Sequence, residues 1–223
     1  MATQKIAAAP SVRRLPLYLQ MVRQAQREGI QYISGTFIAH ELNLKPIQVR
    51  KDLSITPITG KPKKGYPVGS LIRAIEHFLG WDTTRKAVLV GAGNLGTALL
   101  GYQNLRDHGL LMVAAFDNNP EKIGSQIHQV PVFSVETLES NILMWGVKDA
   151  ILTVPSHAAQ AVTEILIKGG IEGIWNFTHV KLKVPDSMVI QKEDLSSGYA
   201  MFCVRMQARQ IGTDLPSSLV PEA

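Results

Sequence analysis

The chain has 223 residues, of which 45 % are hydrophobic and 18 % are charged, so it is long enough for one or two packed domains and unlike a disordered protein. The sequence contains no apolar run of about 20 residues that could span a bilayer, and its single cysteine excludes an internal disulfide or a cysteine-based zinc cage. These features predict a cytoplasmic protein that binds neither membrane nor metal.

Positive charge is concentrated in the first third of the sequence. Residues 1–84 contain 12 Lys and Arg against 5 Asp and Glu, a net charge of +7, whereas residues 85–223 contain 11 against 13, a net charge of −2. Such asymmetry indicates a nucleic-acid-binding part joined to a neutral part. A basic face that meets only solvent would give the same count, so charge alone leaves both interpretations open.

Apolar spacing predicts helices near the start of the chain. The first is expected to begin at Ser11, as its N-cap, and to end before Gly29. A second is expected to begin after the N-cap Ser34, with Phe37 and Ile38 on its apolar side.

A third helix, PIQVRKDLS, is predicted to begin at Pro46, directly after the short turn NLK. Two short helices joined in this way form a helix-turn-helix, whose second helix fits the major groove of DNA, although plain helical bundles contain such pairs too. Ile47, Val49 and Leu53 are expected to point inward. The outer surface is then expected to carry Gln48, Arg50, Lys51 and Asp52, of which Arg and Gln can hydrogen-bond base edges and Lys can bind phosphate.

A lysine-rich segment strengthens the DNA-binding interpretation. In ITPITGKPKKGYPVG three lysines lie between two glycines and are flanked by β-prone residues. The segment predicts a hairpin whose tip reaches the DNA backbone, the wing of a winged-helix domain over residues 1–84. The residues expected to contact DNA are Arg13, Arg14, Gln48, Arg50, Lys51, Lys61, Lys63 and Lys64.

The stretch KAVLVGAGNLG carries Gly91, Gly93 and Gly96 in the G-x-G-x-x-G spacing, between an apolar strand and a helical pattern. The first glycine permits a tight turn, the second lets the backbone approach a pyrophosphate, and the third allows close helix–strand packing. The next strand ends at Asp117, whose carboxylate can accept hydrogen bonds from both adenosine ribose hydroxyls, which favours NAD over NADP. Lys122 is a possible exception to that preference, and an aspartate that only caps a turn is the alternative.

Strand and helix patterns continue to alternate after Asp117, which predicts an α/β fold with a doubly wound parallel sheet, a Rossmann domain, over residues 85–211. The ends of its fourth and fifth strands should border the nicotinamide half of the site. The expected cofactor-binding residues are Gly91, Ala92, Gly93, Asn94, Leu95, Gly96, Asp117, Thr153, Val154, Pro155, Asn176 and Phe177.

The last predicted element is an apolar helix capped by Asp194, which needs a cover from its own sheet or from a partner subunit. Residues 212–223 are expected to form a flexible tail. The histidines form no recognisable acid/base or metal pair, so no catalytic residue is expected, and His157 is the one to test first. Binding without turnover is favoured over an NAD-dependent oxidoreductase with an unrelated basic N-terminal domain, and a CoA- or nucleotide-binding regulatory module is a third interpretation.

Seven short pieces occur in order between residues 11 and 211: RRLPLYL, VRKDLS, GYPVG, VLVGAGNLGTALLGY, AAFD, NF and DLSSG. Together they resemble the Rex family of redox-sensing transcriptional repressors. The resemblance implies a homodimer that binds an inverted-repeat operator in double-stranded DNA and is released when NADH rises relative to NAD+. It also implies that each C-terminal helix is swapped onto the nucleotide domain of the partner.

The resemblance further implies that Tyr102 and Asp194 face one another across subunits and help sense the redox state of the nicotinamide. Leu195 stands where family members often carry Phe after the aspartate. The wing differs as well, since TPITGKPKKG replaces a segment that is rich in Phe and Gly in the family.

Overall fold

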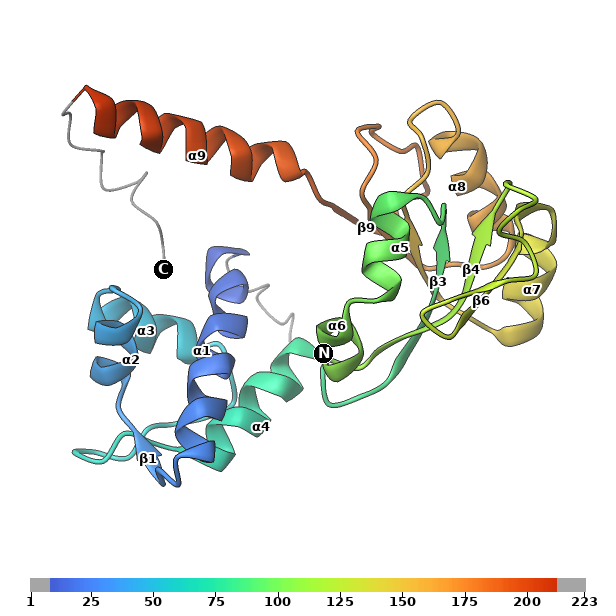
Figure 1. The fold of residues 1–223 in the computed structure, drawn as a ribbon. Coiled ribbons are helices and arrows are strands. Elements are labelled where there is room, and N and C mark those ends of the chain that lie inside the picture. The colour runs from blue at the N-terminus through green and yellow to red at the C-terminus, as the bar shows by residue number, and fades with distance from the viewer. Residues whose placement is uncertain (1–8, 212–223) are drawn as a thin grey trace. The chain divides into compact units, whose positions relative to one another are not determined.

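The computed structural model describes residues 9–211, which form two compact units (Figure 1). The first unit ends at Thr83 and the second begins at Thr84. The boundary expected from the sequence lies between residues 84 and 85. Residues 1–8 and the expected flexible tail, residues 212–223, lie outside the described residues.

The first unit is a helical domain with a small antiparallel sheet. Leu15, Tyr18, Ile38, Leu53 and Leu71 are fully buried in its hydrophobic core. The strands β1 and β2 pair directly before α2 and α4, so this small sheet lies beside the helix-turn-helix formed by α2 and α3. The elements are α1 (Ala9–Arg27), β1 (Tyr32–Ile33), α2 (Gly35–Glu41), α3 (Pro46–Leu53), β2 (Tyr66–Pro67) and α4 (Val68–Leu79).

Local sequence signals set most helix ends in this unit. The hydroxyl oxygen of Ser34 accepts a hydrogen bond from the Phe37 N–H at 3.0 Å, which is the expected N-cap of α2. Pro46 lies in the first turn of α3, where a backbone N–H is not needed. Gly80 ends α4 in the left-handed conformation, with φ of 69°.

The expectation that Ser11 caps α1 is wrong, because α1 already includes Ala9 and runs through both Ser11 and Pro16. A proline inside a helix costs about 3 kcal/mol. Burial of the apolar face of the helix, with Leu15 and Leu19 at most 1 % exposed, outweighs that cost.

The second unit contains a seven-stranded sheet in the order β5-β6-β4-β3-β7-β8-β9. All neighbouring pairs are parallel except β5 with β6. Without the edge strand β5 this is the strand order of a dinucleotide-binding fold, so the predicted Rossmann architecture is confirmed. The strands are β3 (Arg85–Val90), β4 (Leu110–Asp117), β5 (Gln126–Ile127), β6 (Val130–Ser134), β7 (Asp149–Leu152), β8 (Gly173–Asn176) and β9 (Val189–Lys192).

Alternate residues of each strand face two separate cores, as expected for a sheet covered on both sides. Val88 and Val90 of β3 pack with α7 (Leu138–Trp145) and α8 (Ala159–Lys168), whereas Leu89 belongs to a second core with residues of α5 (Asn94–Leu100). Figure 1 shows α5 on one side of the sheet and α7 and α8 on the other.

Three short elements of this unit were not anticipated from the sequence: the helix α6 (Gln103–Asp107), the edge strand β5 and the 3-10 helix η1 (Val135–Thr137), which precedes α7. Residues 156–158 form a turn, and α8 begins at Ala159. The last helix, α9 (Leu195–Gln210), forms as expected, and the carboxylate of its N-cap Asp194 accepts a hydrogen bond from the Ser196 N–H at 2.9 Å.

Candidate functional site

One face of α3 packs into the first unit and the opposite face is exposed. The buried face consists of Val49, Asp52 and Leu53. The exposed residues follow the i, i+3, i+4, i+7 spacing of a single helix face. We call this face the outer stripe, and it consists of Ile47, Arg50, Lys51 and Ser54.

Three expectations about side-chain direction are wrong. Ile47 is 65 % exposed rather than buried, because at 3.6 residues per turn it lies about 200° around the helix from Val49. Phe37 of α2 is also exposed, at 47 %. Asp52 is 1 % exposed and cannot belong to the outer surface, while Gln48 is half-buried beside the outer stripe.

The buried carboxylate of Asp52 binds two side chains of α1. The Arg14 guanidinium donates to both of its oxygens, at 2.7 and 2.9 Å, and the Tyr18 hydroxyl donates at 2.7 Å. Burial opposes ionisation, but the hydrogen bonds from Arg14 and Tyr18 lower the pKa of Asp52 below its ordinary value. Burial, and then the hydrogen bond to Asp52, raise the pKa of Tyr18.

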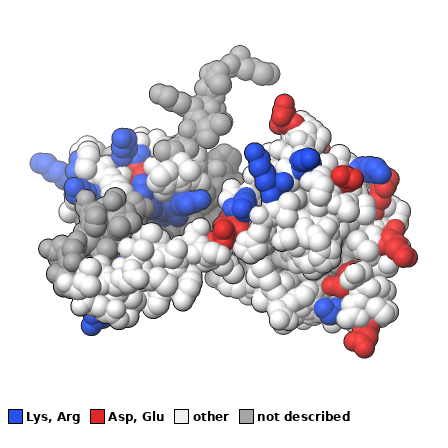
Figure 2. All heavy atoms as spheres, turned by 90° about the horizontal axis from the view of Figure 1, so that it is seen from above, with Lys and Arg blue, Asp and Glu red and all other residues white. Residues whose placement is uncertain are grey.

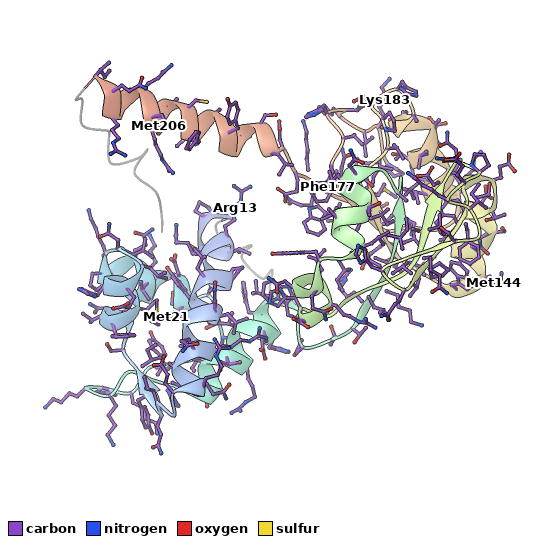
Figure 3. All side chains as sticks on the ribbon, in the orientation of Figure 1. Arg13, Met21, Met144, Phe177, Lys183 and Met206 are labelled. Carbon is purple, nitrogen blue, oxygen red and sulfur yellow. The ribbon has the colours of Figure 1, made fainter. Side chains whose placement is uncertain are left out.

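The expectation that Arg14 contacts DNA is therefore wrong. Arg14 is 5 % exposed, and its charge is already neutralised by Asp52. Its neighbour Arg13 is exposed and projects from α1 (Figure 3). A buried pair of this kind orients α3 on α1 instead of binding a phosphate.

The expected wing forms a tight turn at Lys61–Gly65. The Lys61 N–H donates to the Gly65 carbonyl oxygen at 2.7 Å, and the Gly65 N–H donates back to the Lys61 carbonyl oxygen at 2.9 Å. Lys61, Lys63 and Lys64 are all exposed on this turn. The ammonium groups of Lys61 and Lys64 lie 5.6 and 5.8 Å from the centre of the Tyr32 ring, within cation–π range.

Charge is distributed differently over the second unit. Figure 2 shows acidic side chains of that unit interspersed with basic ones. The basic outer stripe and the wing are thus features of the first unit, where the residues 1–84 carry the net charge of +7.

The carboxyl ends of β3, β4 and β7 meet at the point where the strand order reverses, which is where open α/β sheets bind ligands. The glycine-rich turn joins β3 to α5 at this point. A cavity of about 680 Å³ opens beside it. The cavity is lined by the expected residues Gly91, Gly93, Asp117, Thr153, Val154 and Pro155.

The three glycines differ in what a side chain would meet. Gly91 has φ of 99°, and an added Cβ would lie 2.8 Å from the Thr153 carbonyl group. A Cβ on Gly96 would collide with the Gly91 carbonyl oxygen. A Cβ on Gly93 would meet no described heavy atom within 4 Å, so the exposed backbone at Gly93 and Asn94 leaves room for a bound group. These are the spatial requirements of a pyrophosphate-binding turn.

Asp117 and Lys122 hold the backbone N–H and carbonyl groups of Ala92 in the middle of this turn. One Asp117 oxygen accepts a hydrogen bond from the Ala92 N–H at 2.7 Å, and the Lys122 ammonium donates to the Ala92 carbonyl oxygen at 2.7 Å. The same ammonium lies 3.9 Å from the Asp117 carboxylate. The other Asp117 oxygen accepts from the Asn119 N–H at 2.8 Å, so the aspartate also caps its own turn.

Thr153 positions the first glycine of the turn. Its hydroxyl group donates to the Gly91 carbonyl oxygen at 2.7 Å, and its backbone N–H donates to the Val90 carbonyl oxygen at 2.9 Å. Leu95 follows Asn94 in the first turn of α5. The cavity is also lined by residues that the site prediction omitted, including Asn118, Asn119, Lys122 and His157. The two asparagines directly follow Asp117 in the chain, which is a signal that could have identified them.

Asn176 and Phe177 do not line this cavity, contrary to expectation. Asn176 is 1 % exposed, and its side-chain oxygen accepts hydrogen bonds from the Thr178 N–H and hydroxyl at 2.9 and 2.8 Å. Its amide group donates to the Val180 carbonyl oxygen at 3.1 Å. Phe177, labelled in Figure 3, packs on Trp175 with ring centres 4.9 Å apart. Both residues thus stabilise the loop after β8.

Two of the residues expected to sense the redox state, Tyr102 and Leu195, are exposed, and Asp194 is half-buried. Tyr102 is 54 % exposed, accepts a hydrogen bond from the Asn104 amide at 3.2 Å, and lines a separate hollow of about 340 Å³. Leu195, at the start of α9, is 73 % exposed. Hydrogen bonding from Ser196 lowers the pKa of Asp194.

The helix α9 carries an apolar stripe along its length. Its members recur at the spacing of a single helix face, each is exposed by 41 % or more, and along the described helix no residue is buried. Met206 near the end of this stripe is labelled in Figure 3. We call it the α9 stripe, and it consists of Leu195, Tyr199, Phe202 and Met206.

Residues 9–211 contain no group of three or more His, Cys, Asp and Glu side chains placed to hold a metal ion. Within the same range, every helix is too short or too polar to cross a membrane.

Comparison with protein families gives two matches. Residues 82–180 match the model of the family described as CoA binding domain. Residues 5–54 match that of the family described as putative DNA-binding protein N-terminus. The two matches thus cover the glycine-rich cleft and the helix-turn-helix separately.

Similar proteins extend over almost the whole chain. The redox-sensing transcriptional repressor Rex of Treponema denticola is 57 % identical over 94 % of this chain and all of its own length. The protein of the same name from Bacteroides fragilis is 39 % identical over 91 % of this chain and 92 % of its own.

Two solved structures are similar as well, both of RSP, a Rex-family repressor. RSP in complex with NAD+ and operator DNA has a TM-score of 0.85 at 30 % identity and covers 93 % of this chain and 95 % of its own. RSP in complex with NADH has a TM-score of 0.83 at 30 % identity and covers 93 % of this chain and 97 % of its own.

The buried ion pair gives a prediction about stability. Asp52→Asn removes the carboxylate charge that the buried Arg14 guanidinium binds, which should lower the free energy of unfolding by about 3–5 kcal/mol. Urea denaturation of the full chain, followed by far-UV circular dichroism, measures the change. Replacing all three side chains, in Arg14→Met with Tyr18→Phe and Asp52→Leu, should recover most of the loss, because no buried polar group is then left without its partner. A triple variant as unstable as Asp52→Asn would contradict this account of the pair.

The glycine turn gives a prediction that separates folding from binding. Gly93→Ala should leave the melting temperature unchanged but weaken binding of an adenine dinucleotide, because the methyl group occupies the space left for the ligand. Gly96→Ala should lower stability by about 1–3 kcal/mol and also abolish binding, because it forces the turn away from α5. Thermal melting and fluorescence titration with NADH measure the two effects. Unchanged NADH affinity in Gly93→Ala would refute the assignment of the turn.

Proposed function

The chain belongs to the Rex family of redox-sensing transcriptional repressors, and from this premise we propose that it binds operator DNA and is released from it by NADH. The observation that carries the proposal is that one chain combines an exposed basic recognition helix and wing with a dinucleotide-type cleft. Neither part alone would make a redox-responsive repressor. The protein would act in the cytoplasm, where both operator and cofactor are present.

The operator partner is inferred from the first unit. The outer stripe places Arg50 and Lys51 where they would enter the major groove, and Lys61, Lys63 and Lys64 would contact phosphates beside it. A twofold-symmetric protein presents two such helices, which suits an inverted repeat with half-sites about 34 Å apart. The complex of RSP with operator DNA supports this proposal.

The cofactor is inferred from the cleft. The open backbone at Gly93 fits a pyrophosphate, and the Asp117 carboxylate at the end of β4 fits the adenosine ribose. A 2′-phosphate would be repelled by that carboxylate, which favours NADH and NAD+ over their phosphorylated forms. Lys122 reduces this repulsion, since its ammonium group lies 3.9 Å from Asp117. The complexes of RSP with NAD+ and with NADH support the same choice.

The α9 stripe supports a homodimer. Four exposed apolar side chains on one helix face would be unfavourable in water, and a second copy of the chain would cover them. We infer that α9 is swapped onto the nucleotide-binding unit of the partner, with Tyr102 and Asp194 facing one another across subunits near Leu195. In that arrangement the cofactor would lie at the dimer interface.

Release would then follow from a shift between two dimer arrangements. If NADH binds the closed dimer more tightly than the open one, it moves the population by no more than that difference in affinity. Closure would move the two recognition helices off the half-site spacing. The positive charge and different shape of the NAD+ ring would select closure less strongly.

We propose binding without turnover, because the relatives over almost the whole chain are named as transcriptional repressors. An NAD-dependent oxidoreductase is the second candidate, and the observation in its favour is that His157 lines the same cavity. Steady cofactor consumption that is lost in His157→Ala would support it. A CoA-binding regulator would bind CoA and would not bind duplex DNA with the steep salt dependence that phosphate contacts cause.

The proposed function predicts that DNA binding and the NADH response can be separated by mutation. Arg50→Ala should weaken binding to an operator duplex by about 10- to 100-fold and reduce its salt dependence, because Arg50 would contact the DNA directly. Asp117→Ala should bind DNA normally but lose the response to NADH. Its relative response to NADPH should rise, because Lys122 would then face the 2′-phosphate without a neighbouring carboxylate.

Gel-shift titrations over a salt series, with and without each cofactor, measure both effects. Arg73→Ala, at an exposed arginine of α4, is the matched control for loss of a single charge. Equal effects of NADH and NAD+ on the wild-type protein would rule out the sensor, and a normal NADH response in Asp117→Ala would rule out the ribose assignment.

The proposed dimer predicts that a charge on the α9 stripe separates the subunits. Phe202→Glu should weaken dimerisation by about 100-fold, because a carboxylate would be buried in an apolar interface. Analytical ultracentrifugation measures the change. Met144→Glu, at a 72 % exposed apolar residue of α7, is the matched control and should remain dimeric. A monomeric wild-type protein, or a dimeric Phe202→Glu, would contradict the proposed interface.

A further inference from the structure

Ile47 is an apolar residue placed where a DNA-binding protein meets its target. It lies at the N-terminal end of α3, is 65 % exposed, and belongs to the outer stripe together with Arg50 and Lys51. The other two apolar residues between Ile47 and the end of α3, Val49 and Leu53, are fully buried. The core of the first unit therefore does not account for Ile47.

The chemistry of the major groove offers one apolar feature, the 5-methyl group of thymine. Ile47 precedes Arg50 by three residues, so the two side chains start about 4.5 Å apart along the helix axis at 1.5 Å per residue. That separation lies between one and two base-pair steps of about 3.4 Å each. A helix that brings Arg50 to a base edge would thus bring Ile47 to a base one or two steps away.

A protein surface is a less suitable partner for this face. The interface would have to cover Ile47 together with Arg50 and Lys51, and charged residues are depleted at the centres of protein interfaces. DNA can contact both the basic and the apolar side chains of the outer stripe. Phosphates and guanine edges accept hydrogen bonds from the basic side chains, and a thymine methyl group can contact the isoleucine.

We propose that Ile47 is a specificity-determining residue that reads the methyl group of one thymine in each operator half-site. The inference rests on the proposed function, since it requires that α3 is the recognition helix. It adds an apolar contact to the polar contacts expected of Arg50 and Lys51. The remaining base-edge contacts of the outer stripe would distinguish other positions of the same half-site.

Exchange of thymine for deoxyuridine tests the proposal, because it removes the methyl group and leaves the base-pairing groups unchanged. The probe is a duplex selected from a random-sequence pool by the purified full-length protein. Each thymine of one half-site, with its symmetric counterpart, is replaced in turn by deoxyuridine. Affinities are measured for the wild type, for Ile47→Ala and for the control Met144→Ala, an exposed apolar residue of the second unit.

One symmetric exchange should weaken the wild type and Met144→Ala by about 15-fold, which corresponds to about fourfold for each lost methyl contact at 0.8 kcal/mol. Ile47→Ala should bind the thymine duplex more weakly and should not distinguish thymine from deoxyuridine at that position. Circular dichroism checks that the variant is folded, which its exposure at position 47 leads us to expect.

Two results would overturn the proposal. The wild type could be insensitive to every exchange, or Ile47→Ala could retain the full sensitivity of the wild type. Failure to select any duplex is a different outcome, because it would contradict DNA binding itself.

Discussion

The carboxylate of Asp52 fixes the face that the recognition helix presents, and the rest of the DNA-binding unit depends on this constraint. It lies under α3 and receives hydrogen bonds from Arg14 and Tyr18 of α1. A buried ion pair adds little net stability compared with apolar residues of the same size, but it tolerates few geometries. A rotation of α3 by one residue would separate the pair and bury part of the outer stripe. The interaction therefore specifies an orientation as well as a fold.

The second unit uses polar contacts in a similar way. The backbone of the glycine turn is held from two neighbouring strands: Thr153 at the start of the loop after β7 binds Gly91, while Asp117 at the end of β4 binds Ala92. A ligand at Asp117 would have to share the carboxylate with the Ala92 N–H. Cofactor binding at Asp117 would thus be coupled to the conformation of the turn by one side chain, as the proposed response of the protein to NADH requires.

The sequence predicted the features that local geometry dictates. The N-cap Ser34, the three glycines of the turn, the parallel sheet and α9 all follow from short-range signals or regular alternation, and each is present in the described structure. The failures share a different cause. Arg14 and Asp52 were assigned to the surface because they are charged, and Asn176 was assigned to the cleft because it ends a strand. Each instead satisfies a buried partner from a distant element or a following loop, which periodicity cannot reveal. Ile47 was misplaced for the converse reason, since hydrophobicity alone does not place a residue in the core.

The buried and exposed faces of α3 have different roles, and this affects how the sequences of such proteins diverge. Because Val49, Asp52 and Leu53 carry the packing, the positions of the outer stripe have little part in holding the fold together. Substitutions in the outer stripe should alter which DNA sequence is preferred at small cost to the stability of the fold. Such mutations can therefore accumulate while each variant remains folded. The same helix can then acquire specificity for new operators during evolution, or by design, while the buried residues that pack it on the domain stay unchanged.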